Sequence, residues 1–102
     1  MRIDVITLFP ALFPGPLAES IPGRALERGL AELHAHDLRA WGIGKHRSVD
    51  DYPYGGGAGM ILRPEPIAAA LAAIAPSESG AFRILLDPGG ERFEQPRAAD
   101  LA

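Results

Sequence analysis

The segment HRSVDDYPYGGGAGM, residues 46–60, constrains the fold of this chain more than any other. Its four glycines, three of them consecutive, let the backbone adopt positive φ and approach a ligand closely, at an entropic cost on folding. A flexible linker would mix glycine with serine. Here Asp50, Asp51, Tyr52 and Tyr54 precede the glycines instead. The pattern excludes a helix or a regular strand and indicates a loop whose glycines serve a purpose.

Length and composition predict one small domain or one part of a larger one, since the chain has 102 residues and is 47% hydrophobic. The absence of cysteine excludes disulfides, thiolate metal sites and cysteine nucleophiles, and makes the cytoplasm the default location. No apolar run approaches the roughly 18 residues of a membrane span, so no membrane partner is expected. The N-terminal apolar stretch contains Asp4 and is interpreted as a strand, not a signal peptide.

Charge is distributed unevenly along the chain. The net charge of −3 gives no global field that would attract nucleic acid. Arg39, Lys45, His46 and Arg47 nevertheless fall within nine residues. Such a cluster is typical of a protein that grips phosphates locally, and equally of a solvated loop.

Apolar periodicity and turn residues predict an α/β fold with a mostly parallel sheet flanked by helices. Helices are expected over 21–28 and 64–75 and from Gln95 onward, and a broken turn over 10–20. The expected strands are residues 2–9, 30–38 and 82–86. Three strands are few for a parallel sheet, and the last helix has no stop signal before Ala102. We therefore expect residues 1–102 to be the N-terminal part of a longer protein.

The turn Leu86-Asp87-Pro88-Gly89-Gly90 is the first candidate site, because it follows an expected buried strand. Ligands of open α/β sheets bind at the carboxyl ends of strands, where backbone groups can recognise an adenine edge. On the residues alone, an ordinary strand-exit turn is the better interpretation.

The glycine-rich segment 55–59 is the second candidate. It is neither a Rossmann fingerprint, since no third glycine follows and no apolar strand precedes it, nor a P-loop, since no Gly-Lys-Ser/Thr follows. A structural hairpin or tight bend is the alternative to a ligand-binding loop.

Charged side chains before the glycines are the third candidate. Arg47 is suited to a phosphate or to the Hoogsteen edge of guanine. A carboxylate such as Asp50 can accept from guanine N1–H, or act as a base for it. The alternative is that Asp50 and Asp51 cap a turn or pair with Arg47.

Two other polar or aromatic features receive structural interpretations. His34 and His36 share one face of a strand, but no third metal ligand is evident, so exposed surface histidines are expected and no metal site. Trp41 could stack on a base, but a partly buried anchor is expected instead.

The run HRSVDDYPYGGGAGM, the opening MRIDVITLFP and the stretch GRALERGL together resemble the TrmD family of bacterial tRNA (guanine-N1)-methyltransferases, which have a trefoil-knotted (SPOUT) fold. The resemblance covers the whole chain. It implies methyl transfer from S-adenosylmethionine to N1 of the guanosine immediately 3′ of a tRNA anticodon, by a homodimer. It also implies that the half of the domain that closes the knot lies outside residues 1–102.

The resemblance also implies roles for particular residues. In that family the turn here contributes backbone to the cofactor pocket with the pattern proline, any residue, glycine, which Pro88 and Gly90 match. Asp87 and Gly89 depart from the family's usual serine and larger polar residue, which weakens a side-chain role. The family's general base is an aspartate in its C-terminal half, so no catalytic residue is expected in this chain, which alone would be inactive. The expected substrate-binding residues are His46, Arg47, Asp50, Tyr54 and Gly59, and the expected cofactor-binding residues are Leu86, Asp87, Pro88 and Gly90.

Two rival functions are retained. One is a non-catalytic RNA-binding or dimerisation module. The other is a small-molecule-binding α/β domain that does not bind RNA.

Overall fold

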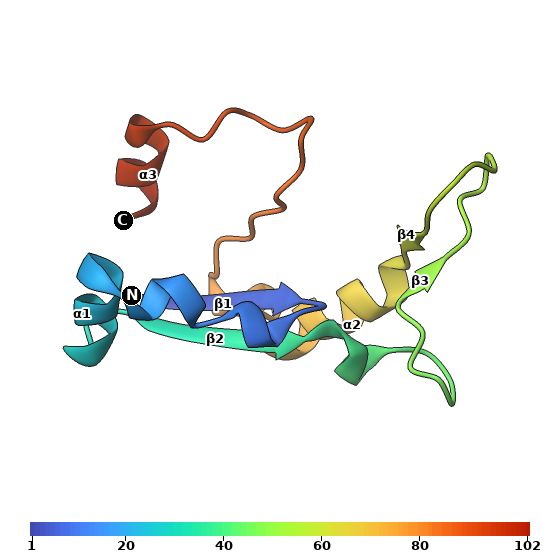
Figure 1. Ribbon diagram of the computed structural model, residues 1–102, viewed down its shortest axis with the longest axis horizontal. Helices are drawn as coiled ribbons and strands as arrows, with labels where there is room; N and C mark the ends of the chain where they lie inside the picture. Colours follow the sequence, from blue (N-terminus) through green and yellow to red (C-terminus); the bar gives the residue numbers. More distant parts are fainter.

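A computed structural model describes all of residues 1–102. Its helices and strands are β1 (Arg2–Thr7), α1 (Ser20–Glu27), β2 (Glu32–Asp37), β3 (Asp50–Asp51), β4 (Ile61–Leu62), α2 (Pro64–Ile74) and α3 (Gln95–Leu101) (Figure 1). Four short 3-10 turns join them: η1 (Pro10–Leu12), η2 (Gly15–Ala18), η3 (Leu38–Trp41) and η4 (Ser77–Ser79). The two expected N-terminal strands, the broken turn and all three helices are confirmed.

β1 and β2 form a parallel pair whose register runs from Arg2 opposite Glu32 to Thr7 opposite Asp37. A parallel pair needs a long crossover, which α1 and the two preceding 3-10 turns provide. α1 ends at Glu27, and Gly29 follows its C-cap with a φ of +67° that suits a residue without a Cβ. The expected parallel sheet is therefore present in its first two strands.

The core lies where α2 packs against η3 and the end of β1. Leu38, Val49 and Ala70 are buried there. Ile67 and Ile74 of α2 pack against this core. Further side chains that pack against the same three residues are Ile6, Leu8 and Trp41. Trp41 is thus the partly buried anchor that its type predicts.

Two parts of the chain extend away from this core. One is the glycine-rich arm, residues 52–60, which joins β3 to β4; the other is the segment 81–94 (Figure 1). The radius of gyration is 15.9 Å, larger than the about 13 Å of a compact 100-residue domain. The chain therefore has a small core with two projections.

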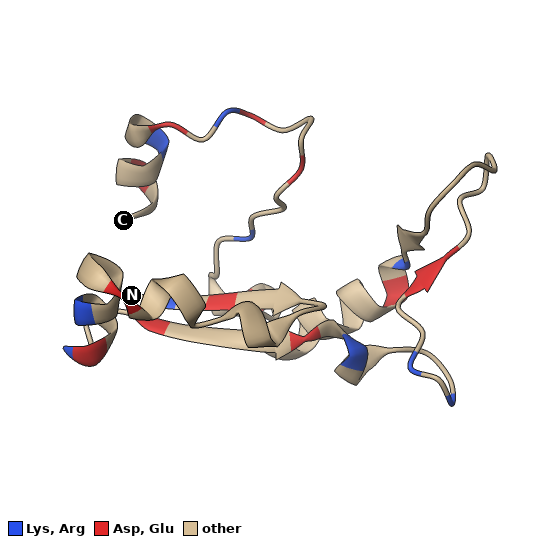
Figure 2. Cartoon of the chain, viewed as in Figure 1, with Lys and Arg blue, Asp and Glu red and all other residues tan.

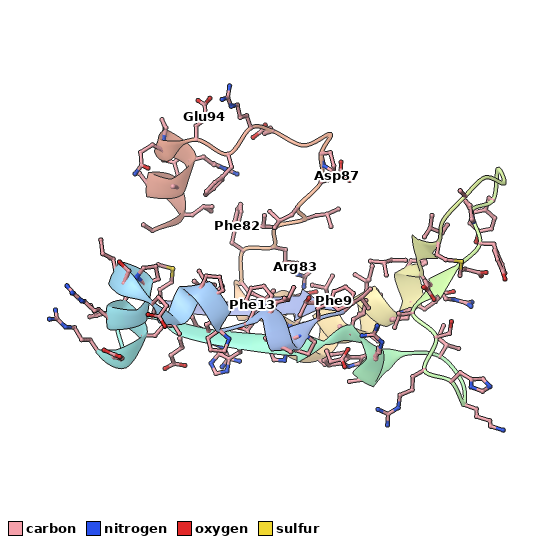
Figure 3. The ribbon with its side chains drawn as sticks, in the orientation of Figure 1. Phe9, Phe13, Phe82, Arg83, Asp87 and Glu94 are labelled. Atoms are coloured by element: carbon pink, nitrogen blue, oxygen red, sulfur yellow. The ribbon has the colours of Figure 1, made fainter.

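The strand expected over residues 82–86 is wrong. The whole segment 81–94 has no regular structure apart from a turn, and Leu86 is 89% exposed. Figure 3 shows Phe82 and Arg83 where the segment leaves the core, and Asp87 and Glu94 along its course. A strand needs a neighbour that satisfies its backbone groups, and β1 and β2 pair only with each other. Apolar composition could not reveal this.

The expectation that residues 46–60 hold no regular strand is wrong at one point. Asp50–Asp51 form β3, which pairs antiparallel with β4, a strand that the sequence did not predict. Both are two residues long, too short for alternation to be visible in the sequence. No helix of the structure is long and apolar enough to cross a membrane.

Candidate functional site

The candidate site is a hairpin built from β3, the arm and β4. Asp50 pairs with Leu62, and Asp51 pairs with Ile61. The hairpin is attached to the core through buried Val49, whose carbonyl accepts from the backbone N–H of Arg63 at 2.8 Å. The carboxylates Asp50 and Asp51 therefore lie at the base of the arm, next to the core.

The arm itself is a glycine turn that presents aromatic side chains. Gly56, Gly57 and Gly59 adopt positive φ values of 73°, 108° and 97°, which other residues rarely tolerate. The N–H of Gly56 donates to the carbonyl of Pro53 at 3.0 Å. Tyr54 is fully exposed. The segment 55–59 is a tight bend within a hairpin, which was the alternative interpretation of its glycines. Ligand binding by this segment stays a prediction.

The arm has no formal charge. Residues 52–62 contain no Lys, Arg, Asp or Glu, and Figure 2 shows the arm's tip without charged residues, with an acidic patch at β3. An uncharged aromatic tip is suited to stacking on a base. It is poorly suited to gripping phosphates, which needs Lys or Arg.

A second turn, residues 43–48, carries His46 and Arg47 at the foot of the hairpin. Ile43 and Ser48 exchange backbone hydrogen bonds of 2.8 and 3.0 Å. A Cβ on Gly42 would lie 2.3 Å from the Arg47 carbonyl oxygen. Only glycine permits this close approach of the two backbone segments. His46 and Arg47 on the turn are both exposed to solvent.

The basic cluster divides in the structure. Arg39 is engaged with the core side: its Nη1 donates to the Leu8 carbonyl, and it lies 3.6 Å from Asp37 and over the ring of Phe9. Lys45 remains exposed on the second turn. The turn therefore leaves its cations exposed, whereas Arg39 links η3 to the residue that follows Thr7 of β1.

The carboxylates do not pair with Arg47. Asp51 Oδ1 accepts from the N–H of Tyr52 at 2.8 Å, and its Oδ2 lies 3.6 Å from Arg63 Nη1. Arg63 is the residue that sequence reasoning missed. Its only signal was its position directly before Pro64, where a helix begins.

The turn expected to bind a cofactor is present without its strand. Asp87 closes it, since Oδ1 accepts from the N–H of Gly89 at 2.7 Å and the backbone carbonyl accepts from Gly90 at 3.0 Å. A Cβ on Gly90 would lie 3.2 Å from that carbonyl oxygen. The Asp87 side chain therefore takes part in closing the turn. Cofactor binding by Leu86, Asp87, Pro88 and Gly90 stays a prediction.

The expected residues thus fall in two places. Asp50, Tyr54 and Gly59 share the hairpin, and His46 and Arg47 lie just before it. The turn that begins at Asp87 belongs to the other projection (Figures 1 and 3). A hollow of about 400 Å³ lies outside both places, since Phe13, Leu26 and Leu33 are among its lining residues.

The histidines on β2 are less exposed than expected. His36 Nε2 lies 2.8 Å from Asp4 Oδ1 on the neighbouring strand and is half-buried. Arg2 donates two hydrogen bonds to the same carboxylate, at 2.8 and 3.0 Å. Arg2, and His36 to a smaller extent, lower the pKa of Asp4 to about 2, against desolvation. This network fixes one face of the β1–β2 pair.

Comparisons with known proteins give the family. The family model described as tRNA (Guanine-1)-methyltransferase TrmD matches residues 1–102. The chain belongs to the TrmD family. It is 53% identical to the tRNA (guanine-N(1)-)-methyltransferase of Chloroflexus aggregans and 50% identical to that of Geobacillus kaustophilus, matching all of this chain and 40% and 42% of those proteins.

A solved TrmD-family structure has the same fold. The crystal structure of tRNA (m1G37) methyltransferase from Aquifex aeolicus superposes with a TM-score of 0.85 at 33% identity. It covers 99% of this chain, which spans 45% of that protein. The chain therefore has the fold of the N-terminal part of TrmD-family, SPOUT-type methyltransferases.

Proposed function

We propose that this chain takes part in methylating N1 of the guanosine immediately 3′ of a tRNA anticodon, with S-adenosylmethionine as methyl donor. The observation that carries the proposal is the match of the family model over all of residues 1–102. The hairpin that presents Asp50 and Tyr54 supports it. S-adenosylmethionine would supply an electrophilic methyl group, and guanine N1 would lose its proton as it gains that methyl.

Each projection has a distinct part in this proposal. The hairpin and the second turn hold tRNA: Tyr54 offers a stacking face, Gly59 a close backbone approach, and His46 and Arg47 contact phosphate or a guanine edge. Asp50 positions the guanine and is not the general base, which the resemblance puts outside residues 1–102.

The cofactor would be held by backbone atoms of the turn at residues 86–90, through Leu86, Asp87, Pro88 and Gly90. The hydrogen bonds of Asp87 close the turn and keep Gly90 close to the Asp87 carbonyl oxygen. We further propose that the active form is a homodimer in the cytoplasm and that residues 1–102 alone are inactive.

A chimera tests the proposal. Residues 1–102 replace the matching 102 residues of the Geobacillus kaustophilus enzyme, to which the chain is 50% identical. We expect the chimera to transfer labelled methyl from S-adenosylmethionine to tRNA, and the 102-residue chain alone to show no transfer. A folded chimera that binds tRNA without methylating it would favour the rival RNA-binding or dimerisation module.

A further inference from the structure

Arg63 lies at the joint between the hairpin and α2. It follows β4 directly and occupies the N-cap position of α2, without a capping hydrogen bond from its side chain. Its backbone N–H is bonded to the carbonyl of buried Val49. Because this hydrogen bond holds the Arg63 backbone against the core, the Cα from which its side chain extends has a fixed position.

The guanidinium group lies between two carboxylates from different elements. Nη1 is 3.6 Å from Asp51 Oδ2 on β3, and Nε is 3.8 Å from Glu65 Oε2 in the first turn of α2. The Arg63 side chain is 31% exposed, compared with 52% for Asp51 and 60% for Glu65. Opposite charges at these distances attract each other, and each pair contributes modestly because both carboxylates are exposed to solvent.

The arm has little else to set its direction. It is joined to the core by β3 and β4, which pair over only two residues each, and so short a hairpin is marginally stable by itself. Asp51 lies at the start of the arm, and Glu65 belongs to a helix packed on the core. A cation that contacts both carboxylates therefore links the direction of the arm to the core.

We propose that Arg63 is a positioning residue that fixes the glycine-rich arm relative to α2, and so sets where Asp50, Tyr54 and Gly59 meet tRNA. The effect on tRNA binding rests on the proposed function. The fixing of the arm rests on the two ion pairs of Arg63. The planar fork of arginine directs donors toward two carboxylates at once, whereas lysine presents a single point charge. With a neutral side chain at this position, both carboxylates would lose their counter-charge.

Hydrogen exchange in the chimera tests the structural half without any assay of activity. Arg63→Gln should speed amide exchange in the β3–β4 pair and at residue 63, whose N–H is bonded to the Val49 carbonyl, by roughly three- to tenfold. This is the factor that corresponds to losing exposed ion pairs. The exchange rates of Arg63→Lys should lie between those of Arg63→Gln and those of the parent chimera. The matched control is Arg92→Gln, because Arg92 pairs with Glu94 at 3.5 Å within one segment and links no elements. Unchanged exchange at the β3–β4 pair and at residue 63 in Arg63→Gln would overturn the inference.

Kinetics test the functional half. Arg63→Gln should raise KM for tRNA by roughly three- to tenfold, with kcat and the KM for S-adenosylmethionine changed less than about twofold. Arg63→Lys should restore part of the loss, and Arg92→Gln should match the parent. Faster exchange with an unaltered KM for tRNA would overturn the positioning role.

The two proposals fail separately. If the parent chimera does not methylate tRNA, the proposed function fails, and hydrogen exchange still decides whether Arg63 fixes the arm. If the parent is active and Arg63→Gln equals it in both measurements, only the inference fails. Should Arg63→Gln not fold, the comparison of Arg63→Lys with the parent decides, with the same expected directions.

Discussion

At Gly42 the site depends on the absence of a side chain, which a substitution that adds one methyl group can test. Gly42→Ala places a Cβ 2.3 Å from the Arg47 carbonyl oxygen, a backbone atom that cannot move aside cheaply. We expect a loss of about 1–3 kcal/mol in the free energy of unfolding of the chimera, as for overpacked sites, measured by urea titration. Gly55→Ala is the control, since its Cβ would meet nothing within 4 Å and φ is not positive there. Equal stability of the two variants would contradict the close approach.

Asp4 provides a test by titration. Its pKa is lowered from 3.8 to about 2, with the Arg2 hydrogen bond as the largest cause. A group whose pKa is lowered in the folded state stabilises it at pH values above the unfolded pKa. That stabilisation should be lost as the pH falls from about 4 to about 2.

Carboxyl NMR of Asp4 should therefore show a midpoint near 2. Arg2→Gln should return the midpoint toward 3.8 by more than His36→Gln does, because Arg2 contributes the larger effect. Equal shifts in the two variants would show that the ranking of the two partners is wrong.

Asp50 separates the substrate from the cofactor. Asp50→Ala in the chimera should lower kcat/KM for tRNA by roughly tenfold or more, the effect of removing a charged hydrogen-bond acceptor. Binding of S-adenosylmethionine, measured by calorimetry, should be unchanged, since Asp50 lies on the hairpin and not on the segment that contains the Asp87 turn. Loss of cofactor binding with intact tRNA affinity would reverse the assignment.

At the scale of elements, the sequence predicted most of what local rules determine. Gly29, Pro64 and Pro76 mark helix ends by their own backbone chemistry, and each lies where the structure ends or begins a helix. The apolar, β-branched run at residues 2–9 predicted β1, but the apolar run at residues 82–86 led to a wrong strand. The two runs look alike, and they differ in whether a neighbouring strand is present.

The candidate site was predictable in type but not in arrangement. The residues of 46–60 indicated a loop with a ligand, and the structure has a hairpin with a bend there. The contact between Asp51 and Arg63 joins residues 12 positions apart along the chain. A lone arginine before a proline carries no sign of such a partner in the sequence. His36 was misjudged for the same reason, since its contact Asp4 lies on another strand.

Cofactor binding by the turn in segment 81–94 can be tested by one substitution. Gly90→Val adds bulk at a position where a Cβ already lies 3.2 Å from the Asp87 carbonyl oxygen. We expect the variant chimera to lose most of the thermal stabilisation that S-adenosylmethionine gives to the parent, since a ligand stabilises only what binds it. Ala81→Val, in the same exposed segment, is the control. A full ligand-induced shift in Gly90→Val would leave the turn as an ordinary bend.

The whole molecule is a small core with two projections, and the proposal assigns tRNA to one and the cofactor to the other. The chain spans 40–45% of the length of these relatives. The family is shown by the match over all residues, whereas the reaction is a proposal for the complete enzyme.

The most direct test of the account is the identity of the nucleoside that the chimera makes. After incubation with S-adenosylmethionine and a tRNA that has guanosine 3′ of its anticodon, the tRNA is digested and its nucleosides are separated by mass spectrometry against standards. The account predicts N1-methylguanosine, absent when that guanosine is replaced by adenosine. A folded, tRNA-binding chimera that yields no methylguanosine, or methylates another atom of guanine, would contradict it.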